Sequence, residues 1–149
     1  MTDFELVKMA MEARTKAYIP YSNHGVGACL VCSDGSIYTG CNVENAGYTG
    51  TNCAERTAIF KAVSEGNKSF AKIAIVGGMM DKETLDLCPP CGVCRQVMRE
   101  FVNPDAFEII LAKVAHATTP NEITEADIET KTYTLSELLP LGFGPENLG

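Results

Sequence analysis

The chain has 149 residues, which is enough for about one domain, and we expect residues 1–149 to fold as a single unit. Its 46% hydrophobic and 21% charged residues exclude a disordered chain, and its net charge of −7 argues against a nucleic-acid partner. No run of about 18 apolar residues is present, so we expect no membrane partner, and charges near the N-terminus argue against a targeting segment. The simplest expected location is the cytoplasm, where clustered cysteines are more often metal ligands or catalytic groups than disulfides.

The first third of the chain predicts one helix followed by a hairpin. Thr2 and Glu5 have the spacing of a capping box, and apolar residues at helical spacing predict a helix over residues 2–18. Two apolar runs, 26–31 and 36–41, flank a Ser-Asp-Gly turn, which is typical of an antiparallel hairpin. A polar loop that contains glycine follows the hairpin.

The rest of the chain alternates helices with strands. We expect helices over residues 53–65 and 91–101, a helical turn at 136–139, strands at 72–77, 107–114 and 132–135, and a polar insertion at 115–130. This order predicts a layered α/β fold in which helices cover a mixed sheet.

Cys91 and Cys94 have the spacing of a chelating pair at the start of a predicted helix. Residues three apart on a helix lie on one face, with Cβ atoms about 5–6 Å apart, so both sulfurs can reach one zinc ion. The partial positive charge at a helix N-terminus also favours the thiolate over the thiol. The pair is therefore a candidate for half of a zinc site.

The segment Cys53-Ala54-Glu55 begins the other long helix and completes the candidate centre. Residues two apart point about 200° away from each other around a helix, so Cys53 and Glu55 can converge only beyond its N-terminus. Thiolates from Cys53, Cys91 and Cys94 would leave the fourth tetrahedral position of zinc for water, as in a catalytic site. Glu55 would then carry the proton of that water.

Such a centre carries excess negative charge, because three thiolates outweigh one divalent cation. Two helix N-termini offset part of it. Arg56 and Arg95 each follow a candidate ligand and could hydrogen-bond the sulfurs. We favour Arg56 for this role, and Arg95 could instead belong to a structural ion pair.

The remaining cysteines offer competing patterns. Cys88 also stands three residues before Cys91, so it could complete a closed four-cysteine structural site, but the two prolines between them resist helical geometry. Cys29 and Cys32 are three apart in a predicted strand, so they face opposite sides and cannot chelate together. We expect both of them, and Cys41, to be small residues of the core.

With these motifs the chain resembles the zinc-dependent cytidine deaminases. Residues 53–55 and 90–96 look like the zinc motifs of that family. The likeness is to the small nucleoside-type enzymes and covers most of the chain outside 115–130, including segments 20–22, 26–28, 40–48 and 138–140. It implies a single-domain, three-layer α/β/α fold with a mixed five-stranded sheet.

The resemblance implies hydrolytic deamination of free cytidine and 2′-deoxycytidine to uridine and 2′-deoxyuridine, with release of ammonia, in pyrimidine salvage. It implies one zinc ion per subunit. Glu55 would protonate N3 of the cytosine ring while a zinc-activated water attacks C4, and would then pass a proton to the departing ammonia. Two alternatives remain: a deaminase of another free cytosine nucleoside, such as a nucleoside antibiotic, and a zinc-stabilised binding module without catalysis.

The same resemblance assigns the substrate contacts. Asn42 and Glu44 match the pair that holds the ribose 3′-hydroxyl, and the Ala54 backbone N–H would contact O2 of the base. His24 stands beside the sugar or the base, where the family usually has Phe. The full expected set of substrate-binding residues is Asn42, Glu44, Ala54, His24, Ala46, Tyr48 and Phe143.

The similar enzymes form homotetramers, in which a loop aromatic and a C-terminal Phe from neighbouring subunits complete each pocket. Tyr48 and Phe143 occupy the matching segments here. We therefore expect a homotetramer with active sites shared between subunits.

Overall fold

The computed structural model describes residues 1–116 and 119–149, and its centre is a five-stranded sheet. The strands are β1 (His24–Cys32), β2 (Ile37–Cys41), β3 (Phe70–Met79), β4 (Glu108–Val114) and β5 (Ile128–Thr134). Their order is β2-β1-β3-β4-β5, in which β3 and β4 are parallel and the other neighbours antiparallel. The prediction of a mixed five-stranded sheet is confirmed.

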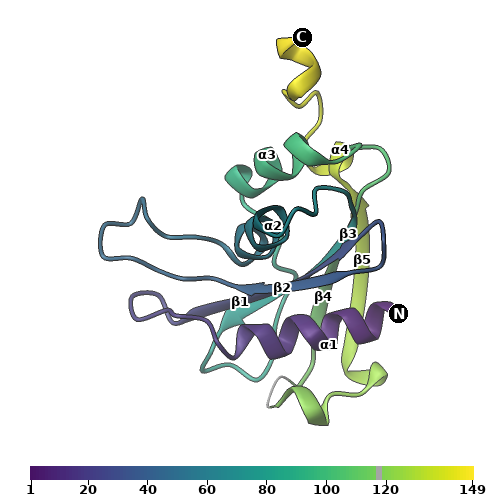
Figure 1. The fold of residues 1–149 in the computed structure, drawn as a ribbon. Helices are drawn as coiled ribbons and strands as arrows, with labels where there is room; N and C mark the ends of the chain where they lie inside the picture. Colours follow the sequence, from purple (N-terminus) through teal and green to yellow (C-terminus); the bar gives the residue numbers. More distant parts are fainter. Residues whose placement is uncertain (117–118) are drawn as a thin grey trace.

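Helices cover both faces of the sheet, as Figure 1 shows: α1 lies on one face, and α2, α3 and α4 lie on the other. The helices are α1 (Asp3–Arg14), α2 (Ala54–Ser64), α3 (Gly92–Phe101) and α4 (Leu135–Leu138), with 3₁₀ turns η1 (Pro120–Glu122), η2 (Glu125–Asp127) and η3 (Pro145–Leu148). Each face has its own buried apolar cluster, so the fold has the three layers that were expected. Within the described ranges, no helix is long and apolar enough to cross a membrane.

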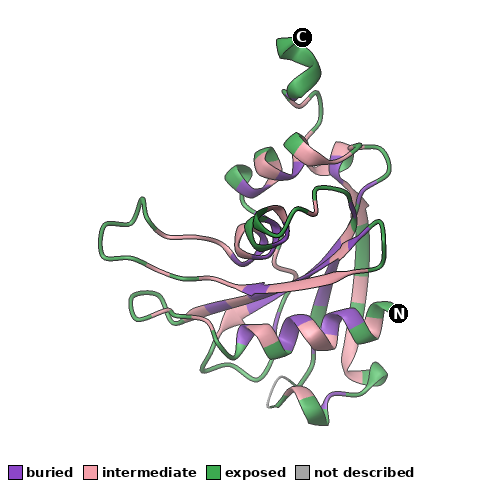
Figure 2. Cartoon of the chain, viewed as in Figure 1, coloured by how far each residue is buried: buried purple, intermediate pink, exposed green. Residues whose placement is uncertain are grey.

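Successive residues of the central strands alternate between the two cores, because side chains in a strand point to opposite faces. Ile73 and Ile75 of β3 pack under α2 and α3, and Figure 2 shows that these inner strands are the most buried part of the sheet. Cys29 and Cys32 lie in different cores, as predicted. The expectation for Cys41 is wrong: it is half-buried, because β2 is an edge strand and leaves its outer side open.

The first helix is shorter than predicted, since it ends at Arg14 rather than near Tyr18. The backbone N–H of Tyr18 donates to the carbonyl of Asn42 at 3.0 Å, and the carbonyl of Tyr18 accepts from the N–H of Glu44 at 2.8 Å. These groups pair with a distant segment and are not free to continue the helix. A contact remote in sequence therefore overrides the local helical pattern.

The polar insertion predicted at 115–130 contains more structure than expected, although residues 117–118 lie outside the described part of the chain. The last strand, predicted at 132–135, begins at Ile128, which pairs with Val114 at the far end of β4. β5 is an edge strand whose exposed residues are polar, so its sequence lacks the apolar run by which a buried strand is identified.

Candidate active site

Three cysteine sulfurs gather where α2 and α3 begin. The Cys91 Sγ lies 3.6 Å from the Cys53 Sγ and 3.4 Å from the Cys94 Sγ, and all three atoms lie within 4.8 Å of one another. A tetrahedral zinc ion with Zn–S bonds of about 2.3 Å holds its sulfur ligands about 3.8 Å apart. The chemistry and the spacing of these donors therefore fit zinc.

The two helix starts explain how the sulfurs meet. Cys53 is the N-cap of α2 and Cys91 the N-cap of α3, and both have extended backbone. The Cys91 sulfur also accepts a hydrogen bond from the backbone N–H of Cys94 at 3.5 Å. Cys53 lies just before the first residue of α2, so its side chain and that of Glu55 can line the same cavity. Their spacing in the sequence predicts that they converge only beyond the helix N-terminus, because residues two apart within a helix point in nearly opposite directions.

Arg56 provides the positive charge that the three sulfurs need. Its Nη2 donates to the Cys53 sulfur at 3.1 Å, and its Nε is buried with no hydrogen-bond partner in the described part of the chain. A hydrogen bond from the Cys94 thiol, opposed by burial and reinforced by Arg56, lowers the pKa of Cys53 to about 5. The thiolate form that a metal requires is thus favoured at Cys53 before any metal binds.

A cavity of about 230 Å³ opens beside the sulfurs, and Glu55 lines it together with Cys53 and Cys91. Glu55 is only 3% exposed. Burial raises the pKa of its carboxyl group to about 7, since desolvation disfavours the charged form. A three-thiolate metal site with an open side and a buried carboxyl group next to it is an arrangement suited to activating water and moving its proton.

Comparison with known proteins agrees with this geometry. A family model described as the cytidine and deoxycytidylate deaminase zinc-binding region matches residues 1–108. The chain belongs to this deaminase family. It is 45% identical to a cytidine deaminase of Halalkalibacterium halodurans over 143 residues, which cover 96% of this chain and 95% of that protein.

A crystal structure of cytidine deaminase from Burkholderia pseudomallei is similar in fold, with a TM-score of 0.76 and 42% sequence identity. The match covers 96% of this chain and all of that one. A blasticidin-S deaminase of Bacillus cereus is also related, at 33% identity over 146 residues, with 95% of this chain and 91% of that protein covered. Family membership and fold are therefore established over nearly the whole chain.

The metal-ligand cluster of this family member consists of three cysteines and not four in the described part of the chain. Among the described residues, the metal-ligand cluster contains Cys53, Cys91 and Cys94 and leaves out Cys88. Cys88 instead lines the cavity next to them, where burial raises the pKa of its thiol to about 11. Because Cys88 stays outside the cluster, the structure does not form the closed four-cysteine site.

Arg95 does not bind the sulfurs in this family member. Its Nε donates to the carbonyl of Pro90 at 2.7 Å, and its Nη1 donates to the carbonyl of Leu138 at 2.6 Å. Arg95 thus joins the cysteine loop to α4 through backbone oxygens, whereas the sequence suggested an ion pair as the structural alternative.

The structure brings some of the expected substrate residues to the deaminase cavity. Asn42, Ala54 and His24 line it. The Asn42 side chain accepts from the backbone N–H of Val26 at 2.9 Å and donates to the carbonyl of His24 at 2.8 Å, so its amide is held in a defined orientation. Val26 and Thr51 also line the cavity, and the sequence reasoning missed both as contact residues.

The other expected contacts lie outside the cavity of the single chain. The Glu44 carboxylate accepts from the backbone N–H groups of Tyr21 and Ser22 at 3.0 and 3.2 Å. The hydroxyl of Ser22 donates to it as well, which lowers the pKa of Glu44. The lining of the cavity also leaves out Ala46, Tyr48 and Phe143.

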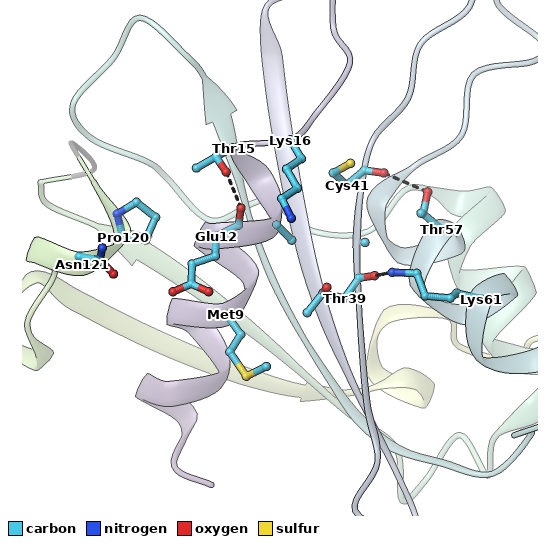
Figure 3. A pocket seen from close by; sticks show the side chains of 12 residues that line it. Met9, Glu12, Thr15, Lys16, Thr39, Cys41, Thr57, Lys61, Pro120 and Asn121 are labelled. Carbon is cyan, nitrogen blue, oxygen red and sulfur yellow. Dashed lines mark hydrogen bonds between the residues drawn. The ribbon is translucent and has the colours of Figure 1, made fainter. Parts of the chain in front are cut away.

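A larger cavity, of about 540 Å³, lies at the free edge of β2, between α1 and α2. Figure 3 shows that side chains of α2 close its wall: Thr57 donates to the carbonyl of Cys41 at 2.9 Å, and Lys61 donates to the carbonyl of Thr39. These bonds occupy carbonyls on the open edge of the strand. None of the three zinc-ligand cysteines lines this cavity, so we assign the chemistry to the smaller cavity.

Proposed function

We propose that this chain deaminates free cytidine and 2′-deoxycytidine hydrolytically to uridine and 2′-deoxyuridine, in pyrimidine salvage. One water is consumed, a C–O bond forms at C4, the C4–N4 bond breaks, and ammonia leaves. The observation that carries the proposal is the buried Glu55 in a cavity that Cys53 and Cys91, two of the three clustered cysteines, also line. To test the proposal, we would measure three quantities on one sample: the loss of cytidine absorbance, the release of ammonia and the number of zinc ions per chain.

The residues around the sulfurs have separate roles in this proposal. Cys53, Cys91 and Cys94 would hold one zinc ion per subunit, which, when bound, supplies a Lewis acid that makes water a better nucleophile at neutral pH. Glu55 accepts one proton of the water and delivers it to N3 of the ring, and it then takes the proton of the new C4 hydroxyl group and gives it to N4, so that ammonia can leave. Burial keeps this carboxyl group away from bulk water while it does so.

Arg56 is proposed to hold the Cys53 thiolate in place and to offset its charge. We expect Arg56→Gln to weaken zinc binding by about 10- to 100-fold, because outer-shell partners of metal ligands commonly have effects of that size. Competition with a chelator of known zinc affinity measures this. Arg95→Gln is the matched control, since its guanidinium binds backbone carbonyls, and an equal loss in both variants would contradict the assignment.

Substrate binding is proposed to combine backbone and side-chain contacts. The Ala54 N–H, at the start of α2, would bind O2 of the base, and Asn42, which lines the cavity, would bind the ribose 3′-hydroxyl. Glu44 is proposed as the second ligand of that hydroxyl, although it lies outside the lining of the cavity in the single chain. His24 borders the same cavity, and its imidazole would contact the sugar or the base.

We propose a homotetramer in which Ala46, Tyr48 and Phe143 complete the pockets of neighbouring subunits. Tyr48 is 77% exposed and Phe143 is 57% exposed, although apolar rings favour burial. The loop between β2 and α2 and the C-terminal segment after α4 project from the body of the chain in Figure 1. Tyr48 packs edge-to-face on Tyr21 at a centroid distance of 6.5 Å. A second copy of the chain is a natural cover for such surfaces.

Sedimentation should therefore show a mass of four 16.0 kDa chains. Phe143→Ala should lower kcat/KM for cytidine by about 10-fold, since a lost ring contact in a pocket has an effect of that order. Zinc content should stay unchanged. Leu148→Ala, in the same exposed tail, is the control, and a fully active monomer would rule out shared sites.

A second candidate function is deamination of a cytosine nucleoside antibiotic. Two observations support this second candidate: the chain is related to a blasticidin-S deaminase, and the polar His24 lines the cavity. Comparing kcat/KM for cytidine, 2′-deoxycytidine and blasticidin S separates the two functions, and we expect cytidine to be the best of the three.

We also propose the cytoplasm as the location. All seven cysteines are free in the structure, including the exposed Cys91. A reducing compartment keeps such thiols available for metal binding.

A further inference from the structure

Gly77 of β3 lies directly under a wall of the catalytic cavity. A β-carbon at this position would lie 2.7 Å from the Cys88 sulfur and 2.9 Å from Cγ2 of Val26. β-Carbons essentially never come within 3.0 Å of a nonbonded heavy atom, so the Cys88 sulfur or the Val26 side chain would have to move. The Cys88 sulfur thus occupies the space that any side chain at residue 77 would take.

Both side chains that contact Gly77 line the cavity of the proposed reaction. Cys88 and Val26 line the cavity together with Cys53 and Glu55. Cys88 stands three residues before Cys91, a stretch of at most about 11 Å, and its thiol interacts electrostatically with Glu55. If the cavity takes cytidine as proposed, Cys88 would border the end that holds the reacting carbon of the pyrimidine, beside Glu55.

The strands behind this wall are held in place. Val26 of β1 and Gly77 of β3 are partners in the sheet. The buried Arg14 donates from Nε to the carbonyl of Gly25 at 2.9 Å and from Nη2 to the carbonyl of Gly78 at 2.8 Å. An atom added at residue 77 must therefore be accommodated by side chains that move into the cavity, not by the backbone.

We propose that the contact between Gly77 and Cys88 determines which substituents on the pyrimidine ring the cavity accepts, an inference that rests on the cytidine deamination proposed above. A sulfur seated on Gly77 leaves room for a group at C5, the ring carbon bonded to C4. A sulfur displaced by a methyl group at residue 77 takes that room. One methyl group in an apolar pocket changes kcat/KM by about 10- to 200-fold.

The quantity to measure is the ratio of kcat/KM for 5-methylcytidine to that for cytidine. Gly77→Ala should lower this ratio at least about 10-fold, and Cys88→Ala should raise it. The double variant Gly77→Ala/Cys88→Ala should return it to within about threefold of the wild-type ratio, because no sulfur then remains to be displaced and the added methyl group would lie 3.3 Å from the Cys88 Cβ. The Cγ2 of Val26, at 2.9 Å, would then be the one contact of the three below 3.0 Å. The ratio of kcat/KM for 2′-deoxycytidine to that for cytidine should stay constant, since the proposed sugar contact is Asn42 and not Cys88.

Gly78→Ala is the matched control. Its β-carbon would also meet a side chain at 2.7 Å, but this is Leu85, in the core on the α1 face. The variant should melt at a lower temperature and keep the wild-type ratio. Three outcomes would overturn this inference and leave the proposed function standing. They are an equal change of the 5-methylcytidine ratio in Gly77→Ala and Gly78→Ala, a change seen only with 2′-deoxycytidine, and an unchanged ratio in an active Gly77→Ala enzyme. A zinc-loaded wild type that does not deaminate cytidine would overturn the proposed function and this inference with it.

Discussion

Glu55→Gln should lower kcat/KM for cytidine by about 100- to 10,000-fold while zinc stays at one ion per chain. A glutamine amide has nearly the size of the carboxyl group but cannot take up or deliver a proton, and general acid–base catalysis contributes about that factor. Loss of cytidine absorbance gives the rate, and atomic emission on the same sample gives the zinc.

Glu65→Gln is the control for this result. Glu65 is the C-cap of the same helix, α2, and is exposed, so its charge lies away from the cavity. Its variant should keep wild-type activity. A Glu55→Gln enzyme with substantial turnover would remove Glu55 from the mechanism, and loss of zinc in that variant would indicate a role in holding the site together.

Cys94→Ser should lose both zinc and activity, with less than about a tenth of an ion per chain after dialysis and a fall in turnover of at least about 100-fold. Cys94 is fully buried, and its sulfur is one of three that fit a single tetrahedral ion, so no outside group can replace it. A serine hydroxyl is not among the ligands that protein zinc sites use.

Cys88→Ser is the matched comparison for metal content. Cys88 is another cysteine of the same cavity, but it lies outside the cluster of three sulfurs. Its variant should keep one zinc ion per chain. If both variants lose the metal to the same extent, the site has four cysteine ligands.

Half of the candidate zinc site could be predicted from the sequence because its geometry is local. Cys91 and Cys94 are about one helical turn apart. The start of each long helix can be recognised in the sequence, because a loop pattern changes there to helical periodicity. Placing Cys53 at a helix start was enough to predict that Glu55 could lie beside the metal. The structure adds that Cys53 is the N-cap itself and that Glu55 is buried.

The binding residues were less predictable, because they depend on contacts between distant segments. Asn42 reaches the cavity through hydrogen bonds to β1, whereas Glu44, two residues later, binds the Tyr21–Ser22 backbone outside it. The early end of the first helix has the same origin, since Tyr18 pairs with residues more than twenty positions away. The hydrophobic periodicity of one segment does not show which distant segment it will contact.

By itself, the sequence indicated the α/β class through the order of its helices and strands, and it indicated the Cys91–Cys94 pair and the Cys53–Glu55 pair through their spacing at two helix starts. Only the tertiary structure decided that Cys88 stays off the metal, that Arg56 rather than Arg95 binds a ligand sulfur, and that Gly77 makes room for the cavity wall. Those outcomes depend on which surfaces meet when helices pack on a sheet. The contacts between helices and sheet depend on how the whole core packs and not on any short segment of the sequence.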